Sequence, residues 1–300
     1  MNWINGFEVL CYVITIMFLI DMIRRKDPVE CWMFLSAALA GFALELLAVR
    51  VTDIYHYSTD FFISIGFKPY QFPLFGGLMW GGLSVYGLRV AKRLDLSPVQ
   101  TALMAGWLIV TMDLFLDVAA IRLNGGFWVW DGREITLAIT HHMFMSVIWV
   151  NFLGYLFETP AIVYLSLRGE DHYRKESFGK NLLRAIGIGL AGIAFVGIAS
   201  GASLLINQIT DEWFACIAFI ILWFVILVMI LRQIFQKKLL PGKITANEIM
   251  TLIYWTAMYV FCIAALLHLG IARARPVYFI FSFAAWLGTC YLAIGRGKEN

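Results

Sequence analysis

Long apolar runs constrain this chain more than any other feature of its sequence. Runs of about 17–25 mostly apolar residues follow one another along the chain, and this length crosses a hydrocarbon layer about 30 Å thick at 1.5 Å rise per residue. Of the 300 residues, 61% are hydrophobic and 14% are charged, against about 45–50% and about 25% in soluble domains. The sequence therefore predicts an all-α, polytopic integral membrane protein.

Nine segments are expected to form transmembrane helices. Their predicted ranges are 7–23, 29–49, 72–91, 99–121, 135–157, 183–206, 212–234, 246–270 and 277–294. The first segment lacks a preceding basic stretch and a following small-residue cleavage site, so it is expected to be retained. No repeat and no Gly/Ser-rich or Pro-rich linker divides the chain. Residues 1–300 are therefore expected to form a single membrane domain.

The basic residues indicate how the helices are oriented. With nine crossings, one face receives 17 of the 23 lysines and arginines, and the other face receives only Arg50, Lys68, Arg122, Arg133, Arg273 and Arg275. The positive-inside rule places the first face in the cytoplasm, with the amino terminus outside and the carboxy terminus inside. A multi-pass protein of the cell membrane is predicted. The net charge of +3 is too small and too dispersed to indicate nucleic-acid binding.

Three carboxylates within the predicted spans are singled out as candidates, because an ionisable side chain in a span costs at least about 2.5–3.5 kcal/mol. They are Glu45 in the second segment and Asp113 and Asp117 in the fourth. The two aspartates are spaced i, i+4 and so project from one face of the helix. Because two such carboxylates repel, one can keep its proton and act as a Brønsted acid.

The same carboxylates allow other roles. The aspartate pair could hold Mg²⁺ for a pyrophosphate substrate. Asp117 could instead pair with Arg122 near the end of its helix, and Glu45 could pair with Arg50 or Arg122.

Histidine and asparagine supply the other polar candidates. His141 and His142 are adjacent near the start of the fifth segment, so only one of them can face a pocket, and His141 is assigned to it. Because the chain has five histidines in total and no further ligands at helical spacing, no histidine-based metal site and no cofactor are predicted. Asn151, in the middle of the fifth segment, is expected to bind substrate or orient a water, or to join two helices.

Two non-cytoplasmic connections, around 50–71 and 122–134, are aromatic rather than plainly hydrophilic. Such loops are expected to lie in the interface or to cap a pocket, and their ring faces could stabilise a carbocation. An interfacial aromatic belt is the alternative. The residues assigned to substrate binding are Tyr55, Tyr57, Trp80, Trp128, Trp130 and Asp131.

Several strings between about 30 and 160 resemble the membrane carotenoid biosynthesis family that contains the carotenoid 1,2-hydratases and the bisanhydrobacterioruberin hydratases. They are Glu45 followed by IYHYSTD at 54–60, FPLFGGLMWGGLSVYG at 72–87, MDLFLD at 112–117, GGFWVWDG at 125–132 and WVNFLGYLFE at 149–158. Val118 stands where the family usually has proline, which indicates a divergent member. Residues 161–300 match only as further transmembrane helices.

The resemblance implies a lyase that hydrates a terminal C=C of a carotenoid-like polyene to a tertiary alcohol. This chemistry needs a desolvated acid, an aromatic wall beside the cation and a placed water, and no redox cofactor. We expect Asp113 or Asp117 to be the acid, and its neighbour or Glu45 to position the water. The partners expected are an isoprenoid or carotenoid and membrane lipid.

Three alternatives share these residues. A membrane terpene cyclase begins with the same protonation but captures the cation with a second double bond, which leaves the product mass unchanged. A membrane prenyltransferase would use the aspartate pair with Mg²⁺, although the companion NDxxD run is lacking. A proton-coupled transporter would use the three carboxylates as an ion path.

Overall fold

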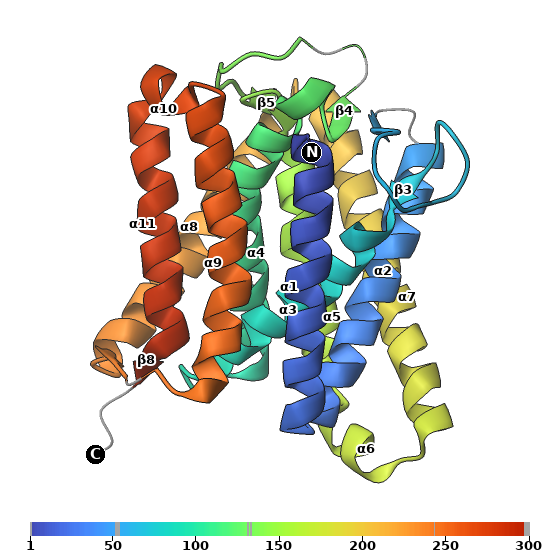
Figure 1. The fold of residues 1–300 in the computed structure, drawn as a ribbon, viewed down its shortest axis with the longest axis vertical. Coiled ribbons are helices and arrows are strands. Elements are labelled where there is room, and N and C mark those ends of the chain that lie inside the picture. The colour runs from blue at the N-terminus through green and yellow to red at the C-terminus, as the bar shows by residue number, and fades with distance from the viewer. Residues whose placement is uncertain (1, 52–54, 131, 133, 243, 297–300) are drawn as a thin grey trace.

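The computed structural model describes residues 2–51, 55–130, 132, 134–242 and 244–296. Long helices dominate these ranges and run along a common direction (Figure 1). Those of 19 residues or more are α1 (Trp3–Arg25), α2 (Pro28–Val51), α3 (Leu74–Lys92), α4 (Pro98–Ala120), α5 (Trp149–Arg168), α7 (Phe178–Ile209), α8 (Trp213–Gln236), α9 (Ala246–His268) and α11 (Pro276–Ile294).

Eight of these helices are long and apolar enough to cross a membrane; α3 is the long helix outside that set. Its glycines, its aromatic residues and Arg89 make α3 less apolar than the others. Nearly all of α3 from Met79 to Ala91 is buried, so other helices rather than lipid surround it. The prediction of an all-α helical bundle is confirmed, with eight helices long and apolar enough to span a membrane.

Helix α4 lies inside the bundle and α7 lies at its edge. The most apolar window of α4 is 94% buried, against 28% for α7. The helices α3, α5, α8, α9 and α11 all pack against α4. Large apolar side chains such as Leu190, Ile198 and Leu205 are exposed on α7, as expected of a helix in contact with lipid.

Local signals set most of the helix boundaries. Ser97 caps α4 through a reciprocal capping box with Gln100, and Pro98 occupies the first turn, where its missing N–H costs nothing. The fifth helix is the exception, because it begins at Trp149 and not at 135. The residues before Trp149 instead form the two-stranded hairpin of β5 (Met143–Phe144) and β6 (Val147–Ile148).

The expected start of the fifth helix at 135 was wrong because a short apolar, β-branched stretch is compatible with both helix and strand. The segment Ile135–Thr140 contains two isoleucines and two threonines, which favour extended backbone. The correction moves His141 and His142 into a loop and puts Asn151 in the first turn of α5.

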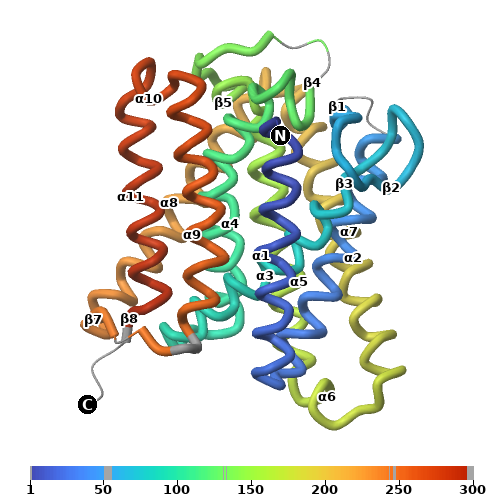
Figure 2. The backbone as a smooth tube through the Cα atoms, viewed as in Figure 1, coloured from blue at the N-terminus to red at the C-terminus, as the bar shows by residue number. Residues whose placement is uncertain are grey.

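Short strands join the loops at one end of the bundle. They pair as β1 (Tyr55–Tyr57) with β4 (Trp128–Trp130) and β2 (Ser64–Ile65) with β3 (Phe72–Pro73). Figure 2 shows these loops at the end where α1 begins, while α6 (Glu170–Lys175), β7 (Leu240–Pro241) and β8 (Gly295–Arg296) lie at the opposite end. The 3₁₀ turn η1 (Leu123–Gly125) and α10 (Ile271–Ala274) complete the structure.

A buried carboxylate anchors the first of these loops to α1. The side chain of Glu8 accepts hydrogen bonds from the backbone N–H groups of Phe62 (2.6 Å) and Ile63 (2.9 Å). The hydroxyl of Tyr12 also donates to Glu8, at 3.2 Å. Three donors compensate the loss of hydration, so a charge in the first helix has a structural explanation.

A second buried charge joins four helices toward the other end. The guanidinium of Arg89 on α3 donates two hydrogen bonds to Glu30 on α2, at 2.6 and 2.9 Å. It also donates to Asp21 on α1 (2.7 Å) and to Thr251 on α9 (3.1 Å). A planar guanidinium suits such bidentate pairing. Arg89 therefore ties α1, α2, α3 and α9 together although it is only 8% exposed.

Glycines allow the closest helix contacts. A Cβ on Gly87 of α3 would lie 2.7 Å from Cβ and 2.8 Å from Cα of Ala105 on α4. On α7, Gly189 and Gly192 have close neighbours. No atom of the described residues lies within 4 Å of a Cβ on Gly187, Gly197 or Gly201.

Replacing Gly87 by alanine should destabilise the bundle, because α3 and α4 must separate to admit the methyl group. Overpacking of this kind costs about 1–3 kcal/mol. Gly187→Ala is the matched control, since its methyl group meets no neighbour and alanine favours helix. Thermal unfolding in detergent should show a lower midpoint for Gly87→Ala only. Equal midpoints for the two variants would contradict this packing.

Candidate functional site

A small cavity lies between α3, α4, the ends of α2 and α5, and the paired loops. Its volume is about 90 Å³. The predicted site residues among those that line it are Glu45, Tyr57, Trp80, Asp113, Asp117, Trp128, Trp130 and Asn151. Sequence positions more than 100 residues apart therefore meet in one chamber, as the prediction requires.

Asp113 and Asp117 lie one helical turn apart on the face of α4 that lines the cavity. They are 5% and 2% exposed, so both carboxyl groups are removed from bulk water. Two buried carboxylates one turn apart repel each other, which favours keeping a proton on one of them. No N–H or O–H donor of the described residues reaches Oδ2 of Asp113.

Asn151 connects this pair to α5. Its amide Nδ2 donates to Oδ2 of Asp117 at 2.6 Å. Because the helix begins at Trp149, the first turn of α5 presents this side chain to the mouth of the cavity. The donor holds one oxygen of Asp117, which makes the two aspartates inequivalent.

Glu45 lies on α2 across the cavity from the aspartates. The phenol of Tyr57 donates to its Oε2 at 2.8 Å. The predicted alternative, in which Arg122 neutralises Asp117 or Glu45, does not fit, because Arg122 donates to the carbonyl oxygens of Val118 (2.7 Å), Met145 (3.0 Å) and Thr136. Arg122 thus organises the loops and does not neutralise Asp117 or Glu45.

The paired strands β1 and β4 bring the aromatic residues to the cavity. Tyr57 lies directly opposite Trp128 in the ladder, and their ring centroids are 5.8 Å apart. Trp80 on α3 packs against Tyr155 on α5, with their ring centroids 4.9 Å apart. Tyr55 pairs with Trp130 through the backbone, and the position of its side chain is not described. Asp131 lies outside the described residues.

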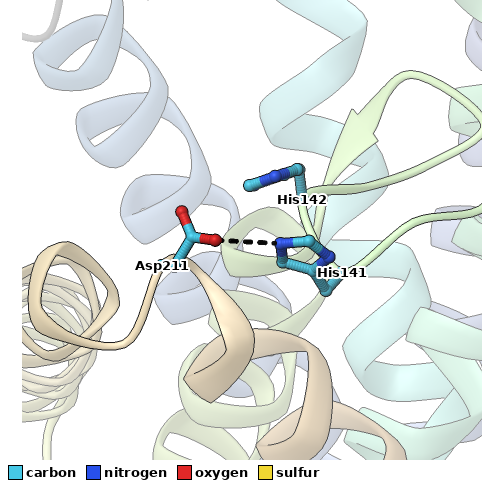
Figure 3. A group of neighbouring side chains, drawn as sticks. All are labelled: His141, His142 and Asp211. Atoms are coloured by element: carbon cyan, nitrogen blue, oxygen red, sulfur yellow. Dashed lines mark ion pairs between the residues drawn. The ribbon is translucent and has the colours of Figure 1, made fainter.

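His141 does not belong to the cavity. It lies in the loop before β5, stacked on Trp213 at 4.4 Å between ring centroids, and its Nε2 is 3.5 Å from Oδ2 of Asp211 (Figure 3). The assignment of His141 to the substrate pocket was therefore wrong. It rested on a helix that was expected to begin at 135 and would have turned one histidine inward.

A larger groove adjoins the cavity and adds residues that were not predicted. It has a volume of about 440 Å³, lies between α2, α5 and α7, and shares Glu45, Trp80, Trp130, Asn151 and Tyr155 with the cavity. Its wall is mainly apolar. The two spaces therefore lie side by side, with Glu45, Asn151 and the three aromatic residues lining both.

Glu158 is the most informative of these additional residues. It lines the groove, is 1% exposed, and its Oε1 has no hydrogen-bond partner among the described residues. Asn151, Tyr155 and Glu158 are spaced i, i+4 and i+7, so one stripe of α5 carries all three. This spacing is visible in the sequence WVNFLGYLFE, but only Asn151 was predicted to be a site residue.

The lining of the cavity has no basic side chain that could contact a pyrophosphate directly. Among the described residues that line it there are three carboxylates and no lysine or arginine. A pyrophosphate carries several negative charges, so it would need Mg²⁺ held by the carboxylates. The arrangement instead suits a neutral, apolar substrate with an acid beside it.

In comparisons with known proteins, no protein-family profile, no curated protein and no solved structure matches this chain. The functional assignment therefore rests on the residues and their geometry.

Replacing Asn151 by leucine should destabilise the bundle by about 1–3 kcal/mol, because Asp117 loses the donor that compensates its burial. The double variant Asn151→Leu/Asp117→Leu removes both polar groups and should recover most of that loss. Thermal unfolding of the two variants and the parent chain in detergent checks this. A double variant less stable than Asn151→Leu would contradict the pairing.

Proposed function

We propose that this chain is a membrane enzyme that protonates a terminal C=C of an isoprenoid and adds water to the resulting cation. The observation that carries the proposal is the pair Asp113 and Asp117, enclosed with Glu45 in an aromatic cavity inside an apolar bundle. Carboxyl groups buried within a membrane bundle are energetically costly and typically belong to functional sites. Acid catalysis on an apolar substrate is a function that requires such groups.

The first step transfers a proton from the aspartate pair to the less substituted, inner carbon of the terminal double bond. The π electrons form the new C–H bond, and a tertiary cation remains on the terminal carbon that carries the two methyl groups. Tyr57, Trp128 and Trp130 would face this cation with their rings, as aromatic rings do with other cations. The acid is left as a carboxylate.

The second step adds water to the cation. Glu45, held by the phenol of Tyr57 at 2.8 Å, would orient the water and accept one of its protons as the C–O bond forms. The proton then returns to the aspartate pair. The product is a tertiary alcohol one water heavier than the substrate, and no oxidant or reductant is consumed.

The volumes indicate how a long substrate would be held. A cavity of about 150 Å³ accommodates one benzene molecule, so the chamber of about 90 Å³ takes only the end of an isoprenoid. The groove of about 440 Å³ between α2, α5 and α7 would take the adjoining part of the chain. The substrate would thus reach the acids sideways from the bilayer.

The proposed enzyme crosses the cell membrane nine times, through α3 and the eight helices that are long and apolar enough to span it. Its amino terminus lies outside and its carboxy terminus lies in the cytoplasm. The distribution of lysine and arginine supports this orientation. It puts the loops that cover the cavity on the outer side and α6 on the cytoplasmic side.

The orientation is testable by cysteine labelling in a variant whose five cysteines are replaced by alanine. A membrane-impermeant maleimide should label Phe67→Cys, at an 85% exposed position in the first loop, in intact cells. It should label Asp171→Cys, at an exposed position in α6, only after permeabilisation. The reverse pattern would overturn the orientation, and labelling of both in intact cells would exclude nine crossings.

The activity is testable by mass spectrometry of lipids from a host that makes lycopene or γ-carotene. Expression of the chain should yield a product one water heavier. Asp113→Asn and Asp117→Asn should each lower its yield about 10²–10⁴-fold, the usual contribution of a general acid. The matched control is Asp95→Asn, at an acid whose side chain is 94% exposed and lies outside the cavity.

Two results would refute the hydratase. An isomer of unchanged mass would assign the same site to a cyclase. Full activity in both aspartate variants would remove the acid mechanism.

A further inference from the structure

Two histidines and two acidic residues gather on the loops outside the cavity. His141 and His142 precede β5, and Asp211 and Glu212 form the turn between α7 and α8. Ligand atoms of His141, His142 and Asp211 all lie within 4.8 Å of one another. Figure 3 shows the three side chains directed toward a common region, from two segments some 70 residues apart in sequence.

The distances match those of a metal site. Zinc bonds of about 2.0–2.1 Å in a tetrahedron place neighbouring ligand atoms about 3.3 Å apart. Nε2 of His141 lies 3.5 Å from Oδ2 of Asp211. A small movement would therefore bring both atoms onto one ion.

The environment of each histidine prepares it as a ligand. Nε2 of His141 is buried and has no hydrogen-bond partner among the described residues, while the ring is stacked on Trp213 at an interplanar angle of 3°. Nδ1 of His142 lies 3.1 Å from Oε2 of Glu212. A carboxylate only accepts, so this contact places the proton on Nδ1 and leaves a lone pair on Nε2.

A carboxylate that holds one nitrogen of a histidine while the other binds metal is a common arrangement around zinc. The site is also open to solvent, because the side chain of Asp211 is 81% exposed. His142 and Glu212 also line a cavity of about 220 Å³, to which His141 and Asp211 do not contribute.

We propose that His141, His142 and Asp211 bind one divalent transition-metal ion of the zinc type, with Glu212 orienting His142 and water in the fourth position. Imidazole ligands favour such ions over Mg²⁺ and Ca²⁺, which prefer oxygen. The ion would fasten the loop before β5 to the α7–α8 turn. That loop also supplies the carbonyl oxygen of Thr136 to Arg122, and the β5–β6 turn supplies that of Met145. The ion would therefore stabilise the loops near the cavity without entering it.

The test uses the full chain in detergent, prepared without a polyhistidine tag and stripped with a chelator. Titration calorimetry with Zn²⁺ should show one saturable site, and Zn²⁺ should raise the unfolding midpoint while Mg²⁺ and Ca²⁺ should not. His141→Gln and Asp211→Asn should each weaken Zn²⁺ binding at least tenfold. The matched control is His172→Gln, which alters a lone histidine–carboxylate pair with Glu176 on α6 and should bind Zn²⁺ as the parent chain does.

Cobalt provides a second readout that does not depend on stability. Co²⁺ bound in a tetrahedral nitrogen and oxygen site absorbs visible light strongly, and this absorption should be absent from His141→Gln. Absence of saturable Zn²⁺ binding in the parent chain would overturn the proposal, as would unchanged binding in both His141→Gln and Asp211→Asn. The outcome is independent of the proposed enzyme activity, because none of these residues lines its cavity.

Discussion

The cost of placing a carboxyl group in lipid is the constraint on which this structure depends. That cost is at least about 2.5–3.5 kcal/mol for each group, and the bundle avoids it by surrounding α4 with other helices. Because the apolar window of α4 is 94% buried, Asp113 and Asp117 face protein and a cavity instead of acyl chains. Peripheral helices such as α7 and α8 carry the lipid-facing surface.

Most other buried charges are compensated by several partners. Glu8 receives two backbone N–H groups and a phenol, Arg89 bridges two carboxylates, and Arg122 donates to three carbonyl oxygens. Around the cavity the pattern differs, because Oδ2 of Asp113 and Oε1 of Glu158 receive no donor from the described residues. Incomplete compensation is costly, and it is typical of functional sites.

The two ends of the bundle contain different kinds of polar cluster. At one end a charged cluster around Arg89 joins α1, α2, α3 and α9, and so fixes how these helices pack. At the other end, aromatic strands and long loops cover the acids, and a groove lies beside them between α2, α5 and α7. Glu158 extends the acidic character of the cavity into that groove. Its place there makes it a candidate for directing the polar end of a ligand.

The sequence by itself determined the helices, the i, i+4 aspartate pair and the aromatic character of the covering loops, because these depend on composition and helical period. Only the tertiary structure decided where α5 begins, since the apolar stretch before Trp149 suits strand and helix alike. It also decided the histidine partners, because Asp211 and Glu212 lie some 70 residues away, and it singled out Glu158 in the middle of α5. Long-range contacts are set by packing, which local periodicity does not encode.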